Sequence, residues 1–230
     1  MIFFDLDGTL LDHDEADKQG VLTLQHHAGL GHIGEEAFYA VYRELMEHIY
    51  EQYLRGELTF AGQRTRRITE LLAHYRITVT GTEADRLFAL YLESFERHWR
   101  CFPDVNDCLL RLADFELGII TNGNREQQLQ KLERLGLRPY FSVIIISEEL
   151  RIAKPDKRIF AEACLKAGKR AEQCMYVGDR LHTDALAAKH AGMRGIWLNR
   201  GNEPFMEQAE VEVISSLSEL SRIVEGGLPA

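Results

Sequence analysis

Two aspartates lie two residues apart, directly after a short apolar run near the N-terminus. Residues 5–10 read DLDGTL, and residues 2–4 before them are Ile-Phe-Phe. If that run is a strand, its alternation places Asp5 and Asp7 on the same side, and Gly8 lets the backbone turn sharply after them. Two converging carboxylates repel each other unless a cation or a proton lies between them. The alternative is a loop in which one aspartate only caps a turn.

A second acidic group follows another apolar run. Residues 178–184 read GDRLHTD and come directly after residues 175–177. Asp184 suits the first turn of the helix that follows, where the helix dipole favours an acid. Asp179 is then left for a metal. Together with Asp5 and Asp7 it would form an all-oxygen site, which fits Mg²⁺ better than zinc.

Two further segments could bind an anion. Residues 121–124 read TNGN and open a helical pattern, so the Thr121 hydroxyl and free backbone N–H groups would lie at a helix N-terminus. Asn124 could instead simply cap that helix, with Gln127 reaching back. Lys154 precedes Pro155, which fits the first position of the next helix. An exposed lysine there is usually solvated, but three nearby acids would make it their charge partner.

Short apolar runs that end abruptly are typical of buried parallel strands. They occur at residues 2–4, 117–120, 143–146, 175–177 and 196–198, with a weaker one at 211–214. Helical patterns lie between them, including the face of Leu129, Leu132 and Leu135. Alternation of strand and helix predicts an α/β, Rossmann-like doubly wound parallel sheet. Ligands bind at the carboxyl edge of such sheets, where the polar groups above would lie.

Residues 14–99 have a different texture, with several helical faces and no convincing strand. We expect an all-helical cap domain inserted into a core domain formed by residues 1–13 and 100–230. Thr59 and Thr82 are expected N-caps, Thr82 with Asp85 as a capping box. Aromatic residues at helical spacing are expected in the cap core, and the arginines at 64, 66 and 67 on a solvated face.

Composition excludes several partners. The chain has 230 residues, with 27 basic and 36 acidic ones, a net charge of −9. Without a basic block, binding to a nucleic acid polymer or to an anionic membrane is not expected. No apolar stretch approaches the ~18 residues that span a membrane. The N-terminus lacks the pattern of a signal peptide, and four cysteines without a Cys-x-x-Cys pair predict reduced thiols and no structural zinc site, so we expect a cytoplasmic protein. The oligomeric state is left open.

The four segments, taken in order, resemble the motifs of the haloacid dehalogenase-like (HAD) superfamily. The resemblance rests on DLDGTL at 5–10, Ile-Thr-Asn at 120–122, Lys-Pro at 154–155, and Gly-Asp at 178–179 with Asp184. A helical cap between the first and second motifs is typical of subfamily I. The segments GIITNG at 118–123, ISEE at 146–149 and AKP at 153–155 most resemble the pyrimidine 5′-nucleotidase-like branch.

The resemblance implies a role for each acid. Asp5 would attack phosphorus and form an aspartyl-phosphate, and Asp7 would protonate the leaving oxygen and then activate water. Thr9 would orient Asp7. The carboxylates of Asp5 and Asp179 and the Asp7 backbone carbonyl would hold Mg²⁺.

The remaining site residues would act on the phosphoryl group. Thr121, the Asn122 amide and Lys154 would hold its oxygens. Asp184 would orient Lys154 or a metal-bound water.

The implied activity is a phosphatase for a small phosphorylated metabolite, with nucleoside 5′-monophosphates as the first candidate. A sugar-phosphate or phosphoglycolate phosphatase would share every catalytic residue. A noncatalytic phosphate-binding or regulatory module would keep the fold but is expected to show a damaged catalytic set, whereas all four motifs are present. Dehalogenation is disfavoured, because a halide leaves without a proton and dehalogenases of this type lack an acid at the position of Asp7.

Overall fold

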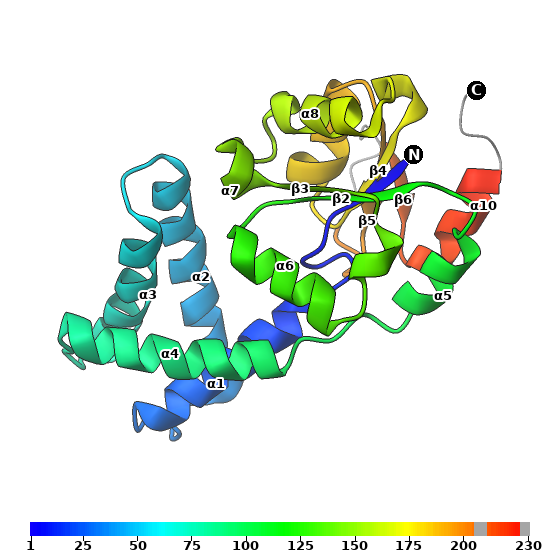
Figure 1. The fold of residues 1–230 in the computed structure, drawn as a ribbon. Helices are drawn as coiled ribbons and strands as arrows, with labels where there is room; N and C mark the ends of the chain where they lie inside the picture. The colour runs from blue at the N-terminus through cyan, green and yellow to red at the C-terminus, as the bar shows by residue number, and fades with distance from the viewer. Residues whose placement is uncertain (205–210, 226–230) are drawn as a thin grey trace. The chain divides into compact units, whose positions relative to one another are not determined.

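The computed structural model describes residues 1–204 and 211–225, and its strands form one parallel sheet (Figure 1). The six strands run in the order β3-β2-β1-β4-β5-β6. They are β1 Ile2–Phe4, β2 Leu117–Thr121, β3 Val143–Ile146, β4 Met175–Gly178, β5 Arg194–Leu198 and β6 Glu212–Ile214. All six coincide with the predicted apolar runs, which confirms the doubly wound sheet.

The strand order creates a switch point between β1 and β4. The chain moves outward from β1 to β2 and β3, then returns to place β4 on the other side of β1. Phe4 is in register with Ile119 of β2 and with Val177 of β4. Because the strands are parallel, the residues that follow β1 and β4 lie at the same, carboxyl-terminal edge of the sheet. The connections after these two strands run to opposite sides, which is where ligands bind in such sheets.

Helices cover both faces of this sheet. Figure 1 shows α8 on one face and α5, α6 and α10 on the other. The helices of this part are α5 Val105–Arg111, α6 Arg125–Arg134, α7 Ser147–Leu150, α8 Lys157–Ala167, α9 Ala187–His190 and α10 Leu220–Glu225. Shorter 3-10 or π turns are η1 Arg138–Tyr140, η2 Ala171–Gln173, η3 Leu181–Leu186 and η4 Leu217–Glu219. Strands β1 and β2 are buried along their whole length, which explains why their sequences are almost continuously apolar.

The chain divides into two compact units, Met1–Asp12 with Arg100–Ala230, and His13–Trp99. The second unit contains four helices, α1 His13–His27, α2 Glu35–Leu54, α3 Phe60–His74 and α4 Gly81–Arg97. Its division from the first unit falls within one residue of the expected domain boundaries. That this helical unit acts as a cap stays a prediction.

Two predicted helix starts were wrong, each by two residues. The capping box of α4 is formed by Thr80 and Glu83, not Thr82 and Asp85, because a glutamate reaches back to the Thr80 backbone N–H at 2.9 Å. Helix α8 begins after Asp156, whose side chain accepts from the Arg158 backbone, so Pro155 lies before the cap. The expected N-cap at Thr59 is confirmed.

Cys101, Cys108, Cys164 and Cys174 are all free thiols, and Cys164 and Cys174 lie with their sulfur atoms 3.8 Å apart. In the part of the chain that the structure describes, no helix is both long enough and apolar enough to cross a membrane.

Candidate active site

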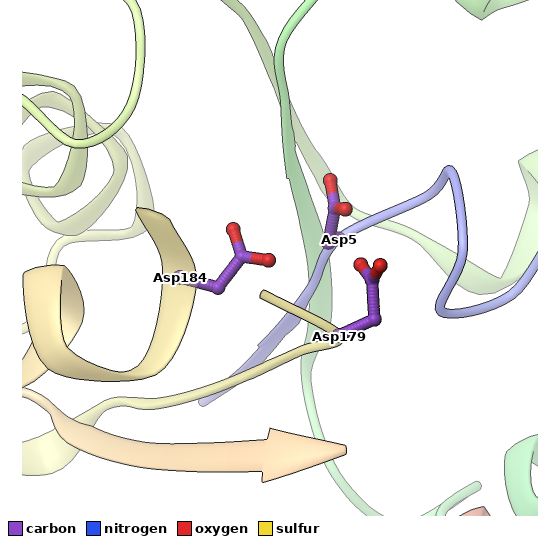
Figure 2. A group of neighbouring side chains, drawn as sticks. All are labelled: Asp5, Asp179 and Asp184. Carbon is purple, nitrogen blue, oxygen red and sulfur yellow. The ribbon is translucent and has the colours of Figure 1, made fainter. Parts of the chain in front are cut away.

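Three aspartates meet at the switch point of the sheet (Figure 2). Asp5 directly follows β1, Asp179 directly follows β4, and Asp184 lies on the π-helical turn η3. One carboxylate oxygen from each lies within 4.8 Å of the others. The strand register produces this convergence, because it brings the ends of β1 and β4 side by side.

Glycines allow the backbone to approach these acids closely. Gly8 has a φ of +87°, and a Cβ there would stand 2.4 Å from Asp179 Oδ2. At Gly178 a Cβ would stand 2.5 Å from the Asp184 side chain. Real Cβ atoms essentially never come so close to another atom, so a side chain at either position would force the neighbouring aspartate to shift, and at Gly8 the positive φ also favours glycine.

Lys154 is the buried counter-ion of this acidic cluster. Its Nζ donates at 2.7 Å to Asp5 Oδ1, to Asp184 Oδ1 and to the Tyr176 hydroxyl. An ammonium group has three protons, so these contacts use all of them. The expected contact between Asp184 and Lys154 is therefore present, whereas a contact from Lys154 to a phosphoryl oxygen requires one of the three to be exchanged.

Burial and mutual repulsion disfavour the ionised form of these acids. Burial raises the pKa of Asp5 to about 8, with Asp184 and Asp179 adding to the rise and Lys154 opposing it. Burial and Asp184 raise the pKa of Asp179 to about 6. A hard divalent cation between these carboxylates would offset their desolvation and keep them ionised. The donor set is all oxygen, which fits Mg²⁺.

These shifts predict how the stability of the metal-free protein depends on pH. The pKa values of Asp5 and Asp179 are raised in the fold, so the folded state binds protons that the unfolded chain releases. The free energy of unfolding should therefore fall as pH rises from about 4 to about 8. We expect a drop in Tm of several degrees across this range in EDTA, reduced by Mg²⁺. A melting series on wild type and Asp5→Asn measures it, and an equally steep slope in the variant would contradict the role of Asp5.

The predicted phosphate-binding segment is locked to the Lys154 loop. Asn122 Nδ2 donates to the Lys154 carbonyl at 3.0 Å, and the Lys154 N–H donates to Asn122 Oδ1 at 2.9 Å. The Gly123 N–H donates to the Ser147 hydroxyl. Asn122 thus positions Lys154, and its contact to phosphate stays a prediction. Asn124 is the N-cap of α6 and accepts from the Gln127 N–H, which confirms its capping role.

Asp7 is bound by side chains of helix α6. Lys131 Nζ lies 2.7 and 2.8 Å from its two carboxylate oxygens, and Gln128 Nε2 lies 3.0 Å from Oδ2. Thr9 was expected to orient Asp7, but its hydroxyl donates to Asp179 Oδ1 at 3.3 Å. The role of Thr9 toward Asp7 therefore stays a prediction.

Comparison with known proteins identifies the family of this chain. The family model of haloacid dehalogenase-like hydrolases matches residues 1–192. The chain belongs to this HAD-like hydrolase family. A glyceraldehyde 3-phosphate phosphatase of Methanopyrus kandleri is 31% identical over 90% of this chain and 86% of its own. Pyrimidine 5′-nucleotidase YjjG of Escherichia coli is 40% identical, over 47% of this chain and 49% of its own.

Among solved structures, this chain is similar to other HAD-like hydrolases. The magnesium-bound HAD-hydrolase YfnB of Bacillus subtilis has a TM-score of 0.82 and 26% identity, covering 97% of both chains. Because its family is that of HAD-like hydrolases and its relatives are phosphatases, this protein is a phosphoric monoester hydrolase.

Several residues that support the HAD-like site were not found from sequence. Tyr176 lies in β4, binds Lys154 and donates to the Ile120 carbonyl at 2.8 Å. Trp197 Nε1 donates to the Asp179 carbonyl at 2.9 Å, and Arg200 donates to the Thr9 carbonyl at 3.0 Å. A polar aromatic inside an otherwise aliphatic buried strand, as at Tyr176, is the one signal that the sequence offered.

The helical unit confirms one expectation and corrects another. Tyr39 and Tyr42 are buried, as predicted for core aromatics, whereas Tyr50, Tyr53 and Phe60, for which the same was expected, are only partly buried. Arg66 is exposed and pairs with Glu70, as a solvated arginine would. Arg64 instead lies over the rings of Phe60 and Phe88, because its helical position turns it inward, so the arginine run is not a uniformly solvated face.

Proposed function

We propose that this protein hydrolyses phosphate monoesters of small sugars by a two-step, Mg²⁺-dependent mechanism with an aspartyl-phosphate on Asp5. The observation that carries the proposal is the convergence of Asp5, Asp179 and Asp184 around Lys154 at the switch point. Three acids gathered beside one lysine are costly in desolvation and mutual repulsion, and such clusters are concentrated at functional sites.

In the first step an Asp5 carboxylate oxygen attacks phosphorus. The bond between phosphorus and the leaving oxygen breaks, and Asp7 gives its proton to that oxygen. Thr121 and Lys154 supply donors for the phosphoryl oxygens, where charge develops in the transition state. Tyr176 and Asp184 hold Lys154 on the side facing Asp5.

In the second step water attacks the phosphorus of the aspartyl-phosphate. Asp7, now a carboxylate, takes the proton from water, and the bond between phosphorus and Asp5 breaks. Inorganic phosphate leaves, and both aspartates return to their starting protonation states. One acid thus serves both steps, as donor and then as acceptor.

The carboxylates of Asp5 and Asp179, together with the Asp7 backbone carbonyl, would hold the metal, with Asp184 close enough to contribute. A bound Mg²⁺ supplies positive charge that keeps Asp5 ionised and neutralises the phosphate. The raised pKa of Asp5 supports this assignment, since without a cation a carboxyl with a pKa of about 8 would be largely protonated at neutral pH. The magnesium-bound relative is consistent with it.

Sugar phosphates are placed ahead of nucleotides because of the extent of the matches. The relative that acts on glyceraldehyde 3-phosphate aligns over 90% of this chain, whereas the nucleotidase aligns over 47%. The segments that resemble the nucleotidase branch lie mostly in the sheet and its loops. A sugar phosphatase with this fold would need them as well.

A phosphate panel tests the proposal. Wild-type protein is assayed with Mg²⁺ against triose and hexose phosphates, nucleoside 5′-monophosphates and para-nitrophenyl phosphate, with EDTA as the matched control. We expect sugar phosphates to be turned over fastest and EDTA to lower the rates by at least about 100-fold. Equal or faster nucleotide turnover would contradict the substrate class, and EDTA-insensitive rates would contradict the metal. Folded protein with no activity on any member would favour a binding module.

A further inference from the structure

Helix α6 buries two polar side chains that an ordinary amphipathic helix would leave in water. Gln128 and Lys131 are three residues apart and share one face, and they are 1% and 2% exposed. Leu129 and Leu135, which the sequence pattern placed on the buried face, are only partly buried. A buried ammonium group is costly unless it is paired and hydrogen-bonded. The buried face of α6 is therefore built around a specific partner.

That partner is the carboxylate of Asp7. Lys131 Nζ lies 2.7 Å from Oδ1 and 2.8 Å from Oδ2, so it bridges both oxygens. Gln128 Nε2 adds a donor at 3.0 Å from Oδ2. The Asp7 side chain is 25% exposed, whereas the Lys131 side chain is 2% exposed. The carboxylate is thus held by α6, and about a quarter of the side chain is exposed.

Gln128 also links Asp7 to the predicted phosphate-binding strand. Its Nε2 lies 2.7 Å from the Thr121 hydroxyl, which in turn donates to the Asn122 carbonyl. Helix α6 begins at Arg125, and its N-cap Asn124 lies two residues after Asn122. One rigid element thus fixes the distance between the group that would hold the phosphoryl oxygens and the acid that would protonate the leaving oxygen.

We propose that Lys131 and Gln128 are positioning residues for Asp7, fixing its carboxylate relative to the phosphoryl group. The inference rests on the proposed function, since it assumes that Asp7 transfers a proton to the leaving oxygen. Lys131 supplies the two-point contact that sets the carboxylate's rotation, and Gln128 ties it to Thr121. Misplacing an acid by about 1 Å is enough to cost about 100-fold in rate.

The test is a comparison of leaving groups, because only poor leaving groups need the proton. Para-nitrophenolate departs unprotonated, whereas the alkoxide of glycerol phosphate does not. We expect Lys131→Met to lower kcat/KM for glycerol phosphate by about 100-fold and for para-nitrophenyl phosphate by less than about 10-fold. The ratio kcat/KM reports the first phosphoryl transfer, before Asp7 acts on water. Gln128→Leu should shift the ratio in the same direction by a smaller factor.

Three further proteins make the comparison specific. Asp7→Asn shows how far kcat/KM for glycerol phosphate falls relative to that for para-nitrophenyl phosphate when the proton donor is lost entirely. Lys131→Arg, which can still contact both oxygens of a carboxylate, should restore most of the wild-type ratio. Lys166→Met is the matched control, since Lys166 is on α8 and its amine donates to the Ile144 carbonyl at the surface. Inhibition by inorganic phosphate should be unchanged in Lys131→Met.

The outcomes separate the inference from the proposed function. If Lys131→Met slows both substrates equally, with melting near wild type, the residue is merely structural and the inference is wrong. If Lys131→Met does not fold, the ratio for Gln128→Leu decides in its place, and an unchanged ratio overturns the proposal. Folded wild-type protein that hydrolyses neither substrate with Mg²⁺ would overturn the proposed function, and the positioning role with it.

Discussion

Asp5→Asn should lower kcat/KM for sugar phosphates and for para-nitrophenyl phosphate alike by at least about 10⁴-fold, because it removes the nucleophile and not only a proton donor. The amide keeps the shape of the neutral carboxyl. The pKa of Asp5 is raised to about 8, mainly by burial, so the fold already favours the uncharged form. We therefore expect Asp5→Asn to melt at or above the wild-type temperature in EDTA near neutral pH, which separates loss of chemistry from loss of structure.

Trapping identifies the covalent intermediate directly. Hydroxylamine cleaves an acyl phosphate and leaves a hydroxamate on the aspartate, so wild type quenched during turnover should carry that mark on the peptide containing Asp5. Asp5→Asn should carry none. Asp107→Asn, an exposed change on α5, is the control and should retain wild-type turnover and labelling. Labelling of another carboxylate, or wild-type rates in Asp5→Asn, would refute the nucleophile assignment.

The sheet could be predicted from sequence because of how parallel strands are buried. A strand covered on both faces needs an unbroken apolar run, and each run here ends in the polar residues of the next loop. The acids could be predicted for the same reason: Asp5 and Asp179 are the first polar residues after β1 and β4. Local sequence therefore determined both the strand ends and the acids that follow them.

The supporting contacts could not be predicted, because they join residues far apart in the chain. Lys131 meets Asp7 across 124 positions, and Lys154 meets Asp5 across 149. In sequence, Lys131 is one of several charged residues on a polar helix, and nothing local distinguishes a buried lysine from a solvated one. The misplaced cap at Thr82 has a local cause, since Thr80 offers the same hydroxyl and has glutamate rather than aspartate three residues on.

Lys154→Met should both stop turnover and destabilise the fold, since Lys154 is the counter-ion of the buried Asp184 carboxylate and also binds Asp5. Asp5 and Asp184 are each bonded to its ammonium group at 2.7 Å, and the lysine side chain is 3% exposed. Removing one member of a buried ion pair costs about 3–5 kcal/mol, because the remaining charge is left without compensation. For a protein of this size that corresponds to a fall in Tm of about 10 °C in EDTA. The loss of a donor to the phosphoryl group should lower kcat/KM by at least about 10³-fold.

A second substitution distinguishes charge balance from lost packing. In Lys154→Met with Asp184→Asn, the uncompensated Asp184 carboxylate is gone, so part of the Tm should return, whereas a packing defect would remain. Mg²⁺ should also raise the Tm of Lys154→Met more than that of wild type, because a cation near Asp5 and Asp179 replaces the missing positive charge. Lys166→Met should match wild type in both buffers. A double variant no more stable than the single one, together with an equal response to Mg²⁺, would show that the lysine fills space rather than balancing charge.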